Sequence, residues 1–106
     1  MSNGFRVLTT HSFEQDIERL EEHIVERELA SNTPDDTCLF RFRDAVEQGM
    51  SILSFAPHTC RRSEEHKAFR ELIIPFGRGG CVVLFTIREL DVLLLAARDQ
   101  HELDYR

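Results

Sequence analysis

The sequence predicts an α+β fold: an N-terminal strand and an antiparallel helical hairpin, followed by a three-stranded antiparallel meander that completes one sheet. Three observations lead to this class. Apolar residues recur at helical spacing over residues 13–30 and 34–55, only a short polar turn separates these two segments, and the spacing becomes that of strands from residue 69. A chain of 106 residues has the usual size of one domain, so residues 1–106 are predicted to form a single domain.

The first strand and the first helix are predicted from residue type and capping chemistry. Residues 5–10 are rich in β-branched and aromatic side chains, as in a strand. Ser12 and Gln15 have the spacing of a capping box, so Ser12 is the predicted N-cap of a helix over residues 13–30. Its apolar stripe consists of Phe13, Ile17, Leu20 and Ile24.

The second helix is predicted to begin at a proline and to end before one. Thr33 is the expected cap and Pro34 the first helical residue, and Pro57 limits the helix to about residue 55. Gly49, inside this helix, costs about 1 kcal/mol relative to alanine unless a neighbouring helix crosses closely there. The apolar stripe consists of Leu39, Phe42, Val46, Met50 and Leu53.

The last part of the chain has strand periodicity. Residues 58–68 are polar and predicted to be a loop, and residues 69–75, 81–87 and 92–97 are predicted strands. A glycine-rich turn over residues 76–80 joins the first two of these strands. The third strand is apolar at nearly every position, which is typical of a strand that is covered on both faces or lies at the centre of a sheet.

The charge balance argues against nucleic acid as a direct partner. The formal net charge is −6, whereas general affinity for nucleic acid needs a basic surface. Lys67 is the single lysine, and the arginines suit specific pairing with carboxylates rather than diffuse attraction. No apolar run is long enough to span a bilayer and no signal-peptide core is present, so we expect a cytoplasmic protein with no membrane contact.

Neither a disulfide, a metal nor a cofactor is predicted. Cys38, Cys60 and Cys81 are an odd number of cysteines without a CxxC motif. The spacing of His58, Cys60 and His66 matches no standard zinc pattern. The glycines of the turn at residues 76–80 join two strands, so they are turn residues rather than a phosphate-binding loop.

Two segments carry a family resemblance. Residues 70–77 read RELIIPFG and residues 96–105 read AARDQHELDY, on either side of the CVVLF strand at residues 81–85. In this order, after a helical hairpin, they resemble the ParE branch of the RelE/ParE superfamily, the toxins of bacterial type II toxin–antitoxin modules. The resemblance covers essentially the whole chain. Asp99 stands where the family often has histidine, and His101 where it often has arginine.

The resemblance implies a toxin domain that forms a hetero-oligomer with a small ParD-like antitoxin. ParE-type members are known as poisons of DNA gyrase, and RelE-type members cleave messenger RNA on the ribosome. The net charge of −6 and the apolar end of strand 69–75 favour the first function, a non-enzymatic contact with gyrase. The alternative is a ribosome-dependent, metal-independent endonuclease with Arg98, His101 and Tyr105 as catalytic residues. A third possibility is an interaction protein without toxicity.

The predicted sheet has two faces, and a single helical hairpin can cover only one of them. We therefore expect an apolar patch on the second face where the antitoxin docks, in preference to a cover formed by the polar C-terminal tail. Arginines beside it could pair with an acidic antitoxin segment. The predicted partner-binding residues are Phe69, Ile73, Leu84, Phe85, Arg61, Arg62 and Arg98.

Overall fold

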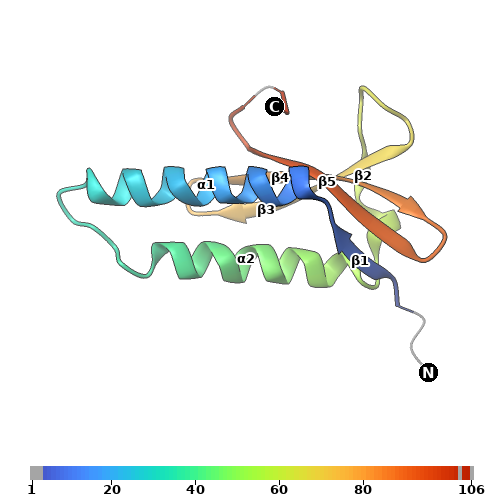
Figure 1. Ribbon diagram of the computed structural model, residues 1–106, viewed down its shortest axis with the longest axis horizontal. Helices are drawn as coiled ribbons and strands as arrows, with labels where there is room; N and C mark the ends of the chain where they lie inside the picture. The colour runs from blue at the N-terminus through green and yellow to red at the C-terminus, as the bar shows by residue number, and fades with distance from the viewer. Residues whose placement is uncertain (1–3, 103, 106) are drawn as a thin grey trace.

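The computed structural model describes residues 4–102, 104 and 105, and it confirms the α+β class (Figure 1). In chain order the elements are β1 (Arg6–Thr9), α1 (His11–Leu29), α2 (Cys38–Leu53), the short 3-10 helix η1 (Pro57–Thr59), β2 (Arg61–Arg62), β3 (Phe69–Phe76), β4 (Gly79–Arg88) and β5 (Asp91–Asp99). Within these residues, neither helix is long and apolar enough to cross a membrane.

The strands form one mixed sheet in the order β1-β5-β4-β3-β2. The three long strands β3, β4 and β5 pair antiparallel with their neighbours in sequence, whereas β1 pairs parallel with β5. Two features differ from the prediction. First, β1 runs parallel to β5, which is possible because both helices and the strands β2 to β4 lie between them in the chain and provide the long connection that a parallel pair needs. Second, residues 61–62, within the segment predicted to be a loop, form the short edge strand β2, which pairs with β3.

Both helices pack on the same face of the sheet, as Figure 1 shows. The buried core between the two layers includes Phe13, Leu20, Ile24, Phe42, Val46, Leu72, Ile74, Val83, Phe85, Val92 and Leu94. Gly49 of α2 lies where a strand comes close, and not a neighbouring helix as considered from the sequence. A Cβ atom there would lie 2.8 Å from the Ile74 Cδ1 atom, so the glycine lets α2 approach β3.

The predicted N-cap of α1 is wrong by two residues. The helix begins at His11, and the Thr10 hydroxyl accepts a hydrogen bond from the Phe13 amide at 3.2 Å. The same hydroxyl donates to the Leu94 carbonyl of β5 at 2.7 Å. Thr10 therefore caps the helix and joins it to the sheet, and this second contact is not visible in the local sequence.

The predicted start of α2 is also wrong, because a local turn replaces its first helical turn. The Asp35 carboxylate accepts hydrogen bonds from the Thr37 amide at 2.9 Å and the Thr37 hydroxyl at 2.6 Å. The Glu28 carboxylate in turn accepts from the Asp35 amide at 2.9 Å. Aspartate side chains compete in this way with helical hydrogen bonds, so α2 begins only at Cys38.

The glycine turn connects β3 and β4 through Gly77 and Arg78 alone. Gly77 has a φ angle of +58° and Gly80 one of +152°, both in the region that favours glycine. A side chain at Gly80 would also collide with the Ile74 carbonyl oxygen of the paired strand. The start of β4 lies against the turn that follows β5, where the Gln100 amide donates to the Gly80 carbonyl at 2.9 Å.

Candidate functional site

Three of the predicted docking residues lie on the sheet face away from the helices. In β3 the side chains of Phe69 and Ile73 alternate with those of Leu72 and Ile74, which belong to the core under the helices. Leu84 of β4 is half-buried and pairs with Ala96 of β5. This face is called the open face below.

The expectation that Phe85 lies on the open face is wrong. Its side chain is 0% exposed in the core under the helices, where it pairs with Leu94. Neighbouring residues of a strand point to opposite faces, so Leu84 and Phe85 cannot both face outward. Because β4 is apolar on both faces, the sequence pattern did not show which residue points toward the helices.

The open face is not bare, because part of it is closed by the chain itself. Val82 and Ala96 are buried, although neither belongs to the core under the helices. The described residues of the C-terminal tail return to this face, and the Tyr105 hydroxyl donates a hydrogen bond to the Glu71 carboxylate at 2.7 Å. The tail therefore covers part of the surface that we expected to be left for the antitoxin.

A polar cavity of about 230 Å³ lies on this face between the edge strand, the end of β5 and the tail. We call it the sheet-face hollow. Its walls include Arg61 and Arg62 of β2, Glu71 of β3, Arg98 of β5 and Tyr105 of the tail. All three predicted docking arginines thus share a single hollow with Tyr105. Two of these four residues, Arg98 and Tyr105, are also predicted catalytic residues.

Glu71 is at the centre of the sheet-face hollow. Its Oε1 atom accepts a hydrogen bond from Arg61 Nε at 3.0 Å, and its Oε2 atom accepts from the Tyr105 hydroxyl. Arg98 Nη2 lies 3.9 Å from the same Oε2 atom. The Glu71 side chain is only 12% exposed, so these partners compensate for a carboxylate with little access to water.

Arg98 is held by the turn that follows its strand. Its Nη1 atom donates to the Glu102 carbonyl at 2.6 Å and to the Asp99 carbonyl at 3.3 Å. The centre of its guanidinium lies 5.2 Å from the centroid of the Tyr105 ring. Its buried Nε atom has no hydrogen-bond partner in the described part of the chain. The guanidinium is thus fixed in position, with most of its donors turned toward the protein.

Burial and the nearby Glu71 carboxylate raise the pKa of Tyr105 above its usual value. Burial is the larger cause, and the hydrogen bond to Glu71 adds to it, because ionisation of the phenol would leave two negative groups in contact. Tyr105 is therefore a neutral donor at physiological pH. In this arrangement its hydroxyl is committed to Glu71 rather than directed toward the solvent.

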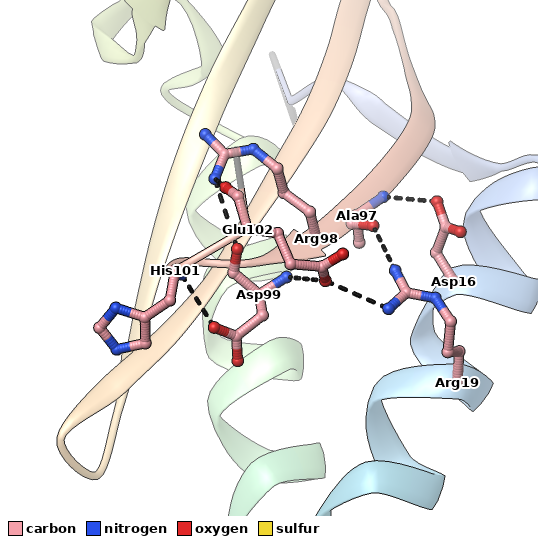
Figure 2. Close-up of polar contacts among 7 residues, drawn as sticks. All are labelled: Asp16, Arg19, Ala97, Arg98, Asp99, His101 and Glu102. Atoms are coloured by element: carbon pink, nitrogen blue, oxygen red, sulfur yellow. Dashed lines mark hydrogen bonds and ion pairs between the residues drawn. The ribbon is translucent and has the colours of Figure 1, made fainter. Parts of the chain in front are cut away.

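His101 does not join the other two predicted catalytic residues. Figure 2 shows its ring directed away from the Arg98 guanidinium, and its amide donates to the Asp99 carboxylate at 2.8 Å. A Cβ atom at Gly79 would lie 3.1 Å from His101 Nε2, so the imidazole lies beside the β3–β4 turn. The structure brings Arg98 and Tyr105 together and places His101 elsewhere.

A network of hydrogen bonds attaches the end of β5 and the turn that follows it to helix α1 (Figure 2). Arg19 Nη1 donates to the Glu102 carboxylate at 3.1 Å, and the same carboxylate accepts from the Asp99 amide at 3.0 Å. One turn earlier on α1, the buried Asp16 carboxylate accepts from the Ala97 amide at 2.9 Å. Helix α1 therefore positions both the end of β5 and the start of the tail.

Sequence reasoning missed Glu71 as a site residue, although a signal was present. In β3 it stands between Phe69 and Ile73 on the face that was predicted to be apolar. A single charged residue on an apolar strand face needs a partner, and here the partners come from β2 and the tail. The sequence shows the exception to the pattern, whereas the partners depend on the tertiary structure.

The sheet-face hollow is not a cationic site. Its three arginines are accompanied by four acidic residues. The acidic residues are Glu64, Glu65, Glu71 and Asp104. Among the described residues, no group of three or more His, Cys, Asp or Glu side chains is placed to hold a metal ion. The hollow therefore offers paired charges for contact with a polar surface rather than a cradle for phosphate groups.

A second exposed feature lies at the tip of the helical hairpin. Val25, Leu29 and Phe40 are 39%, 78% and 62% exposed and line an apolar cavity of about 240 Å³ between the two helix ends. We call these three residues the hairpin-tip patch. Sequence reasoning assigned no role to it, because Phe40 and Leu29 lie off the two predicted stripes.

Comparison with known proteins supports the fold alone. No family model matches the chain, and its sequence matches no curated protein. Among solved structures, the chain is similar to the conserved hypothetical protein HP0894 from Helicobacter pylori. The two share 17% sequence identity with a TM-score of 0.58, over 94% of this chain and 99% of that one. The order and packing of the elements are therefore shared with an existing protein over nearly its whole length.

Proposed function

We propose that this chain is the single-domain toxin of a type II toxin–antitoxin module, which acts in the cytoplasm by protein–protein contact with DNA gyrase. A ParD-like antitoxin neutralises it in a hetero-oligomer. The family resemblance suggests this class, and the shared fold is compatible with it. The two segments that carry the resemblance correspond to β3 with its turn and to the end of β5 with the tail.

The observation that carries the non-enzymatic form of the proposal is the composition of the sheet-face hollow. Acidic residues outnumber arginines there, and Arg61 and Arg98 are already engaged by Glu71 or by backbone carbonyls. Binding of RNA releases counterions from several phosphates and needs unpaired cations to replace them. A protein surface with mixed charges is a better partner for such a site.

A supercoiling assay with purified gyrase tests the proposal. We expect the purified chain to inhibit supercoiling of relaxed plasmid at a small molar excess over gyrase, and to leave a type I topoisomerase unaffected. Inhibition of both enzymes would indicate a nonspecific effect on DNA. Full gyrase activity at a large excess of the folded protein would contradict the proposal.

The hairpin-tip patch and the exposed part of the open face are the proposed docking surface for the antitoxin. An exposed cluster of large apolar side chains is typical of a surface that a partner covers. Phe40 lies in the hairpin-tip patch, whereas the equally exposed Phe55 lies beyond the other end of α2. Phe40→Ser should weaken antitoxin binding about tenfold or more, because apolar anchors dominate such interfaces.

Phe55→Ser is the matched control and should leave antitoxin binding unchanged, since the exposed fractions, 62% for Phe40 and 68% for Phe55, are similar. The antitoxin would be the product of a short reading frame beside the gene. Hydrogen exchange of the complex should show new protection at the C-terminal end of α1 and at Ile73. Equal effects of the two substitutions would exclude the hairpin-tip patch as the docking surface.

One observation favours the alternative, a ribosome-dependent endonuclease. Arg98, Tyr105 and Glu71 lie within contact distance in one hollow, and such groups can serve as electrophile, acid and base. In a cell-free translation reaction this function predicts cleaved transcripts, and Tyr105→Phe should abolish the cleavage. Intact transcripts together with gyrase inhibition would support the proposed function instead.

A further inference from the structure

The overhang pocket, as we call it, is a cavity of about 410 Å³ on the helix side of the sheet. It forms because the helical hairpin extends past the β3–β4 turn, as Figure 1 shows for α1. The walls come from the second half of α1, the start of α2, the β3–β4 turn and the turn after β5. Its volume is in the lower part of the range for small-molecule sites.

The floor of the overhang pocket is apolar. Leu20 and Ile24 of α1, Phe42 of α2 and Phe76 of β3 line it. The Phe42 and Phe76 rings meet edge to face with their centroids 5.4 Å apart, which fixes the shape of the floor. An apolar group of matching size would therefore be desolvated on entering the pocket.

The rim of the overhang pocket is cationic. Arg27 comes from the last turn of α1, Arg78 from the β3–β4 turn and Arg41 from the start of α2. Arg41 is paired with Asp35. In the part of the chain that the structure describes, the exposed guanidinium groups of Arg27 and Arg78 take part in no hydrogen bond or ion pair. Two unpaired cations from distant parts of the sequence thus face one apolar pocket.

The two acidic residues in the wall already serve other donors. The Glu28 carboxylate accepts from the Asp35 amide at 2.9 Å, and the Asp99 carboxylate accepts from the His101 amide at 2.8 Å. Both carboxylates therefore already accept a hydrogen bond from the backbone of a neighbouring loop. In a chain of net charge −6, the rim is a place where arginines outnumber acidic side chains.

We propose that the overhang pocket binds a small monocarboxylic acid with an aromatic or branched apolar body. The body would lie on the Phe42 and Phe76 floor, and the carboxylate would accept hydrogen bonds from Arg27 and Arg78, whose guanidinium geometry matches it. The three arginines and the two acidic residues of the wall, Glu28 and Asp99, leave one net positive charge, which a single carboxylate balances. The second charge of a dianion such as a phosphate monoester would be repelled by the two acidic residues.

Calorimetry and NMR titration with 4-phenylbutyrate test this inference. We expect 4-phenylbutyrate to bind and to shift the amide resonances of the β3–β4 turn and of the first turn of α2. The alcohol 4-phenylbutanol has the apolar body without the carboxylate, and inorganic phosphate has the negative charge without the apolar body. Each should therefore bind at least about tenfold more weakly than 4-phenylbutyrate.

Two arginine variants and a matched control make the test specific. Arg27→Gln and Arg78→Gln should each weaken 4-phenylbutyrate binding about tenfold, the effect of one lost charge-assisted hydrogen bond. Arg88→Gln changes another exposed arginine, at the opposite end of β4, and should leave binding unchanged. All three arginines are exposed, so the variants should fold, which thermal melting would check. Equal affinity in all three variants, equally tight binding of the alcohol, or no binding at all would overturn the proposal.

Discussion

The two faces of the sheet are closed by different kinds of contact. On the face under the helices Phe85, Leu94 and Ala97 are 0% exposed, whereas on the open face Ile73 remains 41% exposed. The helix side is closed by apolar packing with the Asp16 contact as an anchor at the end of β5. The open side is closed in part by hydrogen bonds and ion pairs among Arg61, Glu71, Arg98 and Tyr105.

This difference separates contacts that contribute most of the stability from contacts that contribute less and are easier to exchange. Apolar burial stabilises in proportion to the area removed from water, and close packing makes it hard to rearrange. Hydrogen bonds and ion pairs near the surface contribute about 1 kcal/mol each and can be exchanged for bonds to a partner. The contacts on the open face are therefore easier to exchange than those on the helix side.

The largest expected effect is that of Phe85→Ala. Removing a fully buried phenylalanine should lower the free energy of unfolding by about 3 to 5 kcal/mol. Ile73→Ala, on the open face, should cost only about 1 kcal/mol, because much of the side chain is already in water. Urea unfolding of both variants measures the difference. Similar losses would show that the two faces contribute equally to stability.

Asp16→Ala should have the next largest effect, on the helix side. It leaves the buried Ala97 amide without its acceptor, at a cost of about 1 to 3 kcal/mol. Amide exchange at Ala97 should accelerate in the variant. Glu18→Ala, which changes an exposed acid on the same helix, is the control and should be close to neutral. A neutral Asp16→Ala would mean that the end of β5 is held without this contact, by packing and by the remaining hydrogen bonds to β4 and Arg19.

Thr10→Ala should cost about 1 to 2 kcal/mol, the usual range for a lost N-cap. Thr10 caps α1 and also donates to the Leu94 carbonyl, so the effect should lie toward the upper end of this range. Ser12→Ala should be nearly neutral, because the helix has already begun at that position. Denaturant unfolding of both variants measures the two losses of stability. A larger loss for Ser12→Ala than for Thr10→Ala would show that Ser12 is the N-cap, as the sequence suggests.

Tyr105→Phe should have the smallest effect of the series, about 1 kcal/mol, because it removes one hydrogen bond at a partly exposed site. On the open face this loss should loosen the tail without unfolding the sheet. Thermal melting and amide exchange of the tail would measure the two consequences. A loss as large as that of Phe85→Ala would contradict the division between the two faces.

The alkaline titration of Tyr105 sharpens the same comparison. Burial and Glu71 raise the pKa of Tyr105 in the folded state, so its contribution to stability is fully present below the unfolded value of about 10 and is lost as the pH rises toward the folded value. The chain has one tyrosine, so phenolate absorbance reports this group alone. Glu71→Gln should move the phenolate transition to lower pH, and an unchanged transition would contradict the contact.

Much of the fold followed from periodicity, whereas the helix starts did not. The stripes through Phe13, Leu20 and Phe42 placed both helices, because apolar spacing reflects which face is buried. The start of α1 at His11 depends on the Thr10 hydroxyl, which donates to the Leu94 carbonyl of β5. The start of α2 at Cys38 depends on the Asp35 carboxylate, which accepts from the Thr37 amide. In the sequence alone, Ser12 and Thr33 are equally good candidates for the two caps.

The candidate site was predictable only in part. Arg61, Arg62, Arg98 and Tyr105 were singled out from the sequence and share the sheet-face hollow. Glu71, which joins them, was missed, because its partners come from segments that meet only in the folded chain. Arg98, His101 and Tyr105 were predicted to act together because their side chains are suited to catalysis. The His101 ring, however, points away from the Arg98 guanidinium (Figure 2).

The sequence by itself determined the α+β class, the number of helices and the long strands, because these depend on the local spacing of apolar residues. Only the tertiary structure decided which face each residue of the all-apolar strand β4 occupies, that β1 runs parallel to β5, and that the tail returns to Glu71. The physical reason is that a local pattern records how often a side chain is buried. Which surface buries it depends on contacts between residues far apart in the chain.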